Sequence, residues 1–308
     1  MWRNSLLTGL LASSKKVDMK KIAFCVLALL LPFTASAGIL GPEKQNRDAT
    51  YFVGKDEFAS AIVVDVGSGM ILYHYNDEKP WSGASLTKIM SSYTFIQNDP
   101  SWSKIVQIKS EDEVGGGRLR VDDGAQLSEE DLFFSSLTAS ANNAATAMPR
   151  VLGFGSDAFL VQMNATAKKF AMRQTSYVDM SGMDPSNITS ARDIAKLAFR
   201  TFSNDWIRRA MTTAEYEFII RNTGEVKRLK NTNYLLIDPA HSDVYVTGGK
   251  TGFLYESMYN FVTQIRPATD KDSTRTLIVV VLGSPNRDAS FESTKALAKW
   301  TWENYTWD

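Results

Sequence analysis

The chain has 308 residues, in which 34 Lys and Arg residues balance 34 Asp and Glu residues, and 44% of the residues are hydrophobic. This balance excludes both the broad basic surface that binds nucleic-acid backbones and the acidic excess that keeps chains disordered. The length is sufficient for one large domain with a core and a cleft. We therefore expect a globular protein that does not bind nucleic acid.

The first 37 residues have the layout of a cleavable secretory signal. A basic start after Met19 precedes ten apolar residues, Ile22 to Leu31, and the small tripeptide Ala35 to Ala37. Ten apolar residues fall short of the roughly 20 that span a bilayer, so a transmembrane anchor is the weaker interpretation. We predict a signal peptide over residues 1–37, with Met19 as the better start site, and export to the periplasm or another extracytoplasmic space.

Removal of this segment changes the chemistry available to the mature chain, residues 38–308. The only cysteine, Cys25, is lost with it. A thiol nucleophile, a thiolate metal site and a disulfide are then excluded. Two histidines remain, His74 and His241, and no His-Glu-x-x-His pattern is present, which argues against a zinc hydrolase.

Hydrophobic periodicity predicts strands at both ends of the mature chain and helices between them. The predicted strands are Ala59 to Val66, Met70 to Tyr75, Tyr216 to Arg221, Val226 to Leu229, Val244 to Thr247, Asn260 to Ile265 and Thr276 to Leu282. The predicted helices run from Ser85 to Pro100, from Ser128 to just before Ser140, and over Phe159 to Met172, Ala191 to Phe202 and Phe291 to Tyr305. Pairing of the strands in one antiparallel sheet around a helical insertion, over about residues 85–205, would give an α+β fold with a cleft where the helices meet the sheet.

The first motif with catalytic potential runs from Ser85 to Lys88. Residues three apart share a helix face, so the Lys88 amine can reach the Ser85 hydroxyl. An amine can activate a hydroxyl if burial or a second cation lowers its pKa from about 10.4. The same Ser-x-x-Lys pattern occurs at Ser13 and Ser101, so a helix cap followed by a solvated lysine remains the alternative. Of the three, Ser85 is the one that opens an apolar-periodic helix.

Two further short motifs follow in the chain. Ser140 to Asn142 offers a hydroxyl and an amide in a loop between predicted helices, with simple helix termination as the alternative. Lys250 to Gly252 follows two glycines on a predicted strand, where Lys250 could hold a carboxylate and lower the pKa of Lys88 by repulsion. An edge-strand lysine that prevents aggregation is the alternative there. The order of all three motifs is more specific than any one of them.

This order resembles that of the low-molecular-mass penicillin-binding proteins of the D-alanyl-D-alanine carboxypeptidase/endopeptidase family. The resemblance covers roughly residues 59–282. It is carried by Ala84 to Met90, Ser140 to Ala145, Phe159, Met163 and Asn164, Ser190 to Asp193, Asn231 to Asn233, and Gly249 to Phe253. It implies a β-lactamase/transpeptidase-like fold: a five-stranded antiparallel sheet flanked by helices, with an all-α subdomain inserted, in a single domain over residues 38–308.

The resemblance also implies a role for each motif residue. Ser85 would be the acylated nucleophile, Lys88 the general base, and Ser140 a proton relay to the leaving amine. Asn142 would hold the substrate amide, and Lys250 and Thr251 would bind the terminal carboxylate. Gly252 and Phe253 would complete the substrate-binding motif, and the backbone N–H groups of Ser85 and Phe253 would form the oxyanion hole. The implied substrates are peptidoglycan stem peptides and the implied covalent inhibitors are β-lactams. No metal or organic cofactor is implied, and no oligomeric state.

Some features depart from the family pattern and leave the activity open. Relatives usually follow the third motif with Thr and a small Ala-Gly pair, whereas Leu254 and Glu256 to Met258 stand here and should rim the cleft. Because the sequence ends soon after its last predicted helix, we expect no C-terminal β domain of the kind found in the larger carboxypeptidases, a compactness that resembles the endopeptidases. Carboxypeptidase activity is our first expectation, and cleavage of cross-links by a DD-endopeptidase is the alternative.

Two other functions compete with a peptidase. A β-lactamase shares the serine and lysine motifs, but the Glu-x-x-Leu-Asn segment of the class A enzymes is absent between Ser140 and Lys250. A non-catalytic protein that binds β-lactams or peptidoglycan would be expected to lose one of the motifs, and none is lost. Both functions rank below the peptidase.

Overall fold

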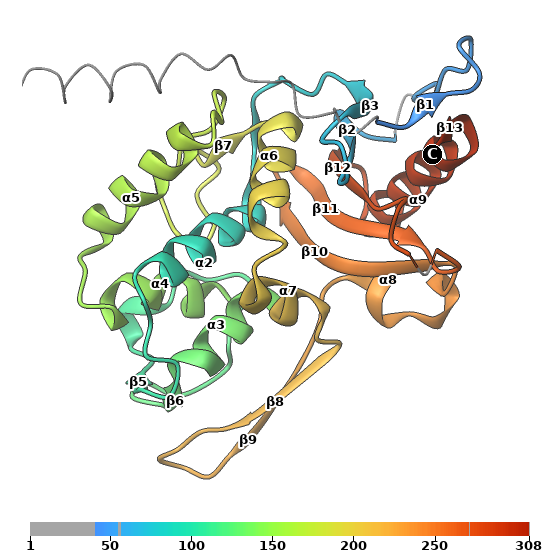
Figure 1. The fold of residues 1–308 in the computed structure, drawn as a ribbon. Coiled ribbons are helices and arrows are strands. Elements are labelled where there is room, and N and C mark those ends of the chain that lie inside the picture. The colour runs from blue at the N-terminus through green and yellow to red at the C-terminus, as the bar shows by residue number, and fades with distance from the viewer. Residues whose placement is uncertain (1–40, 55–56, 271, 308) are drawn as a thin grey trace, which may run out of the picture. The chain divides into compact units, whose positions relative to one another are not determined.

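The computed structural model describes residues 41–54, 57–270 and 272–307 (Figure 1). The predicted signal peptide and Cys25 lie outside the described residues. Within the described residues, no helix combines the length and the apolar character needed to cross a bilayer.

A five-stranded antiparallel sheet, in the order β10-β11-β12-β2-β3, forms the centre of the fold. Its strands are β10 (Val244–Leu254), β11 (Met258–Pro267), β12 (Leu277–Ser284), β2 (Ser60–Asp65) and β3 (Ile71–Tyr75). The two apolar runs of the sequence, in β2 and β12, lie side by side and are buried almost throughout. Strands covered on both faces need side chains that are apolar in both directions, which explains these continuous runs.

Successive residues of β2 belong to two different hydrophobic cores because strand side chains alternate between faces. Ala61 and Val63 face a core that is closed by α9 (Arg287–Asn304). Ile62 and Val64 face a larger core that contains α2 (Thr87–Gln97) and α6 (Ala191–Thr201). The sheet is thus covered by helices on both faces (Figure 1), and the predicted α+β fold with a five-stranded antiparallel sheet is confirmed.

The remaining helices pack around α2 on the same side of the sheet. They are α3 (Glu129–Thr138), α4 (Asn142–Val151), α5 (Ser156–Lys169) and α7 (Asp205–Thr212). The predicted start at Ser128 is confirmed by a capping box, in which the Ser128 hydroxyl accepts from the Asp131 N–H at 3.0 Å and the Asp131 carboxylate accepts from the Ser128 N–H at 2.9 Å. The sequence analysis missed α4, which contains Pro149, and the short α7.

The prediction that all the strands share one sheet is wrong for two of them. β8 (Glu215–Ile219) and β9 (Val226–Lys230) pair only with each other and project as a hairpin (Figure 1). Charged residues fill half of their positions and only Phe218 is buried, so neither strand offers the apolar faces of a central strand. The predicted turn between them contains Gly224, whose φ of 75° is in the left-handed region.

Three short strand pairs complete the structure, together with the helical turn α8 (Tyr234–Ile237). The pairs are β1 (Glu43–Lys44) with β13 (Tyr305–Thr306), β4 (Trp81–Ser82) with β7 (Ile188–Thr189), and β5 (Ile105–Gln107) with β6 (Gln126–Ser128). The β4–β7 pair anchors the segment that leads to Ser85, because β4 is followed directly by the turn that contains this serine.

Replacement of Phe159 on α5 by alanine should destabilise the fold. The Phe159 side chain is fully buried in the larger core, so its removal should lower the free energy of unfolding by about 3–5 kcal/mol. Val161 lies on the same helix with 68% of its surface exposed, and Val161→Ala should change the free energy by less than about 0.5 kcal/mol. Urea unfolding of both variants measures the difference; equal effects would contradict the described core.

Candidate active site

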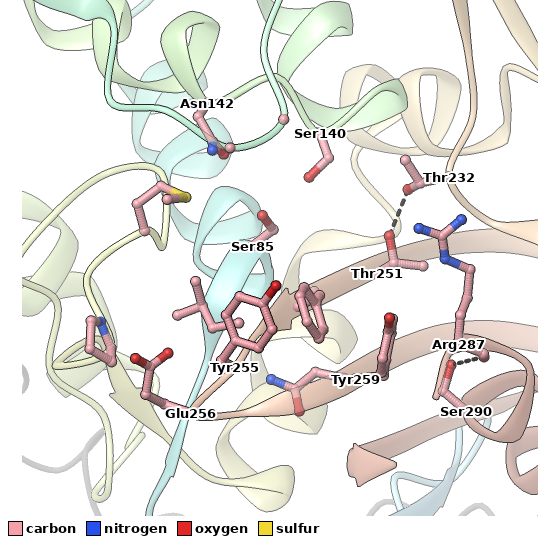
Figure 2. Close-up of a pocket in the computed structure, with 18 of the residues that line it drawn as sticks. Ser85, Ser140, Asn142, Thr232, Thr251, Tyr255, Glu256, Tyr259, Arg287 and Ser290 are labelled. Carbon is pink, nitrogen blue, oxygen red and sulfur yellow. Dashed lines mark hydrogen bonds between the residues drawn. The ribbon is translucent and has the colours of Figure 1, made fainter. Parts of the chain in front are cut away.

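A cleft of about 550 Å³ lies between the sheet edge formed by β10 and the helical region (Figure 2). Its walls come from separate parts of the chain: the segment before α2, the loop before β6, the loop between α3 and α4, the segment between α5 and β7, and β10 with the turn that follows it. Its lining residues include Ser85, Gly116, Gly117, Ser140, Asn142, Met183, Pro185, Thr232, Thr251 to Glu256, Tyr259, Asn260, Arg287 and Ser290.

Two close backbone contacts hold Ser85 in the cleft. Ser85 lies in a single 3₁₀ turn, η2 (Ala84–Leu86), and α2 itself begins at Thr87, two residues later than the predicted helix. Ala84 has a φ of 45°, a costly conformation for a residue with a side chain. A Cβ atom on Gly182 would lie 1.9 Å from the Ala84 carbonyl oxygen, and one on Gly252 would lie 3.2 Å from the Ser85 nitrogen. Residue 182 must therefore be glycine for this approach, and a side chain at residue 252 would crowd the Ser85 backbone.

Lys88 is fully buried beneath Ser85. Its Nζ donates to Asn142 Oδ1 at 2.6 Å and to the Ser181 carbonyl at 2.5 Å, and it is hydrogen-bonded to Ser85 Oγ at 2.9 Å. Burial disfavours the charged ammonium and lowers the pKa of Lys88 from 10.5 to about 7, against the opposing effect of the Asp179 carboxylate. The amine beside Ser85 is therefore substantially neutral near pH 7.

The Ser-x-x-Lys pattern at Ser101 does not form such a pair. Ser101 is exposed, and the Lys104 amine contacts Glu129 at 3.1 Å and the Val151 carbonyl at 2.7 Å. Ser13 lies outside the described residues. Identical spacing thus gives different chemistry at Ser85 and Ser101, because Lys88 is buried beside its serine whereas the Ser101 pattern lies at the surface.

A turn centred on Asp179 supplies one of the Lys88 contacts, and the sequence analysis missed it. The Asp179 carboxylate accepts from the Ser181 N–H at 2.5 Å, the Gly182 N–H at 2.6 Å and the Asp184 N–H at 2.7 Å. These bonds fix the Ser181 carbonyl against Lys88. An Asp two residues before Ser-Gly is a signal for such a turn. The contact between this turn and Lys88 could not be predicted locally, because Lys88 and Ser181 are 93 positions apart.

Ser140 and Asn142 face Ser85 from the helical wall. Ser140 has a φ of 59°, and Figure 2 shows its hydroxyl directed toward Ser85. Asn142 is the first residue of α4, which corrects the prediction that the whole motif is a loop. Its Nδ2 donates to the Gly115 carbonyl at 2.8 Å and its N–H to the Gly117 carbonyl at 2.7 Å. Asn142 therefore connects Lys88 to the glycine loop of residues 115–117, part of which lines the cleft.

The third motif lies on β10, and its residues face different ways. Lys250 is 1% exposed and donates from Nζ to the Thr251 carbonyl at 2.9 Å. Burial lowers the pKa of Lys250, and the Lys88 charge lowers it further. The predicted repulsion between the lysines thus acts on Lys250, whereas burial is the main cause of the low Lys88 pKa. Thr251, Gly252 and Phe253 line the cleft, and Thr251 Oγ1 donates to Thr232 Oγ1 at 2.7 Å.

Arg287 is a cleft residue that the sequence analysis also missed. It is exposed at the start of α9, after Asn286, which caps this helix through the Ala289 N–H at 2.8 Å. Its Nη1 donates to the Tyr234 hydroxyl at 3.0 Å, and its guanidinium lies 5.4 Å from the Tyr234 ring centre. No local pattern marks an arginine at a helix start as a cleft residue.

The two histidines lie outside the cleft lining. His74 is exposed and contacts Asp77 at 3.2 Å, and His241 lies 3.3 Å from the Lys295 amine. In the part of the chain that the structure describes, no group of three or more His, Cys, Asp or Glu residues is arranged to hold a metal ion.

Comparison with known proteins identifies the family. A sequence profile of the peptidase S11 family, D-alanyl-D-alanine carboxypeptidase, matches residues 53–286. The chain belongs to this family. It is a serine peptidase of the S11 family, as the resemblance implied.

Relatives with either activity are similar to this S11 peptidase in sequence. The D-alanyl-D-alanine endopeptidase of Pseudomonas aeruginosa is 27% identical over 78% of the chain and 76% of its own length. The D-alanyl-D-alanine carboxypeptidase DacF of Bacillus subtilis is 25% identical over 91% of the chain and 70% of its own length. Among solved structures, the Streptomyces K15 DD-transpeptidase shares the fold with a TM-score of 0.73 and 21% identity, covering 82% of this chain and 100% of its own.

Removal of the Asp179 charge should lower the pKa of Lys88 below about 7, because this carboxylate stabilises the charged ammonium. Asp179→Asn is the test, measured by NMR titration of the Lys88 side chain. Asp184→Asn, in the same turn, is the matched control and should leave the pKa in place. A raised or unchanged Lys88 pKa in Asp179→Asn would contradict the described electrostatics.

Proposed function

We propose that this S11 peptidase hydrolyses the D-Ala-D-Ala bond of peptidoglycan stem peptides through an acyl-enzyme at Ser85. The observation that carries the proposal is the buried Lys88 amine, 2.9 Å from the Ser85 hydroxyl. A serine hydroxyl needs an adjacent base to act as a nucleophile, and this amine has a pKa of about 7.

The contacts of Lys88 favour proton transfer from Ser85. A neutral amine has two N–H donors and one lone pair. Asn142 Oδ1 and the Ser181 carbonyl can only accept, so they take both N–H groups. The lone pair is then left for the Ser85 hydroxyl, whose proton passes to Lys88 as Oγ attacks the substrate carbonyl.

The attack forms a C–O bond and places a negative charge on the carbonyl oxygen. The backbone N–H groups of Ser85 and Phe253 would stabilise this oxyanion. When the C–N bond breaks, Ser140 would relay a proton to the leaving amine, leaving an ester on Ser85. Water then hydrolyses the ester, with Lys88 again accepting a proton, and Ser85 is regenerated. No step requires a metal or organic cofactor.

The substrate's terminal carboxylate would bind Arg287 together with the hydroxyl groups of Thr251 and Thr232. Arg287 is exposed in the cleft, whereas the Lys250 ammonium is buried beneath the lining and donates to a backbone carbonyl. This modifies our first assignment, in which Lys250 held the carboxylate directly. Lys250 would instead influence the electrostatic potential at Thr251 from its buried position below the cleft lining.

Carboxypeptidase activity is the first proposal and DD-endopeptidase activity the second. Both reactions expel an amine that lies next to a carboxylate, so the same cleft residues serve either reaction. The endopeptidase of P. aeruginosa supports the second proposal as much as DacF supports the first. Penicillins, as mimics of the D-Ala-D-Ala unit, would acylate Ser85 and act as covalent inhibitors.

We also propose that the protein acts outside the cytoplasm, in the periplasm or another extracytoplasmic space of the cell envelope. The layout of residues 1–37 as a secretory signal and the position of peptidoglycan in the envelope support this location.

Replacement of Ser85 by alanine should abolish covalent labelling of the protein by a fluorescent penicillin, because the acylated oxygen is lost. Ser101→Ala removes the serine of the second Ser-x-x-Lys pattern and should label like the wild-type protein. Labelling is read by denaturing gel electrophoresis. Label that survives in Ser85→Ala would overturn the assignment of the nucleophile.

Incubation with purified muropeptides distinguishes the two activities. Release of D-alanine from pentapeptide monomers identifies a carboxypeptidase, and conversion of cross-linked dimers to monomers identifies an endopeptidase. If the protein is labelled by penicillin but catalyses neither reaction, a non-catalytic binder would be favoured. Rapid turnover of nitrocefin would favour a β-lactamase.

A further inference from the structure

The turn between β10 and β11 places a carboxylate at one end of the cleft. Glu256 is exposed and belongs to the cleft lining. None of the ion pairs among the described residues involves it. Figure 2 shows Glu256 and Arg287 on opposite sides of Ser85. The cleft thus has an anionic end and a cationic end with the serine between them.

The edge of the sheet gives this charge separation a direction. β10 is an edge strand, and Thr251 to Leu254 line the cleft along it. An extended peptide can bind such an edge as an additional strand. With its terminal carboxylate at Arg287 and Thr251, the peptide runs back toward Leu254, antiparallel to β10. Its residues before the scissile bond therefore approach the β10–β11 turn.

The spacing places one substrate residue next to Glu256. Strand residues advance about 3.4 Å each, so the residue two positions before the terminal D-Ala lies about 7 Å along β10 from Thr251. That position is opposite Phe253 and Leu254, at the start of the turn, which closes where Leu254 pairs with Met258. A long side chain on this residue can reach Glu256.

The surroundings of Glu256 suit an aliphatic chain that ends in a cation. Tyr255 is 87% exposed and packs edge-on against Phe253, with ring centres 5.4 Å apart. Met183 and Pro185 add further apolar surface to the cleft lining. Apolar carbons of a substrate side chain can lie against this apolar lining, with a terminal ammonium at the Glu256 carboxylate.

We propose that Glu256 binds the side-chain ammonium of a diamino-acid residue that precedes the D-Ala-D-Ala unit, and so selects stem peptides in which this amine is free. The inference rests on the proposed function and adds to it a specificity residue. Glu256 acts in substrate recognition alone, because the acylation of Ser85 requires no group at this end of the cleft.

The test compares two substrates, Nα-acetyl-L-Lys-D-Ala-D-Ala with a free ε-amine and its Nα,Nε-diacetyl form. Wild-type protein should hydrolyse the free-amine peptide with a kcat/KM roughly 1.5- to fivefold higher, the range of an exposed ion pair. Glu256→Gln should remove this preference and Glu256→Lys should reverse it. Added salt should weaken the wild-type preference.

Two controls separate this inference from the proposed function. Glu303→Gln removes an exposed carboxylate at the far end of α9 and should keep the wild-type preference. Acylation by benzylpenicillin, which lacks the amine, should be equal in wild-type protein and Glu256→Gln. Equal hydrolysis of the two peptides by wild-type protein, or an unchanged preference in Glu256→Gln, would overturn this inference alone. Failure of wild-type protein to hydrolyse either peptide would overturn the proposed function as well.

Discussion

The burial of the Lys88 amine is the constraint on which the rest of the site depends. A buried amine loses its hydration, so its remaining polar contacts must come from the protein. Here they come from three separate segments: the Ser85 hydroxyl, the Asn142 amide at the start of α4, and the Ser181 carbonyl in the Asp179 turn. The base is therefore complete only when the helical region has closed around α2.

The same closure explains the unusual backbone of the site. Ala84 and Ser140 both have positive φ angles, and Gly182 and Gly252 allow the chain to approach Ser85 from two sides. Strain of this kind persists where the surrounding packing determines the conformation, and it collects at functional sites. The sheet contributes a rigid edge at β10, so the nucleophile, its base and a peptide-binding strand are fixed relative to one another.

Local patterns in the sequence predicted the parts of the site that are close in the chain. Lys88 lies three residues from Ser85, and the strands of the sheet and the capped helix at Ser128 follow from periodicity and end signals. Asp179 and Arg287 could not be predicted, because their roles depend on contacts between distant segments. The β8–β9 hairpin was assigned to the main sheet because strand periodicity does not reveal which strand is the partner.

The most direct test of the account is the pH dependence of the rate of acylation by benzylpenicillin. A base with a pKa of about 7 predicts an acylation rate constant that rises as pH increases through about 7 and then levels off, because the neutral fraction of Lys88 is then complete. A rate that is independent of pH across this range, or one that rises only near the ordinary lysine pKa of 10.5, would contradict the central role of the buried amine.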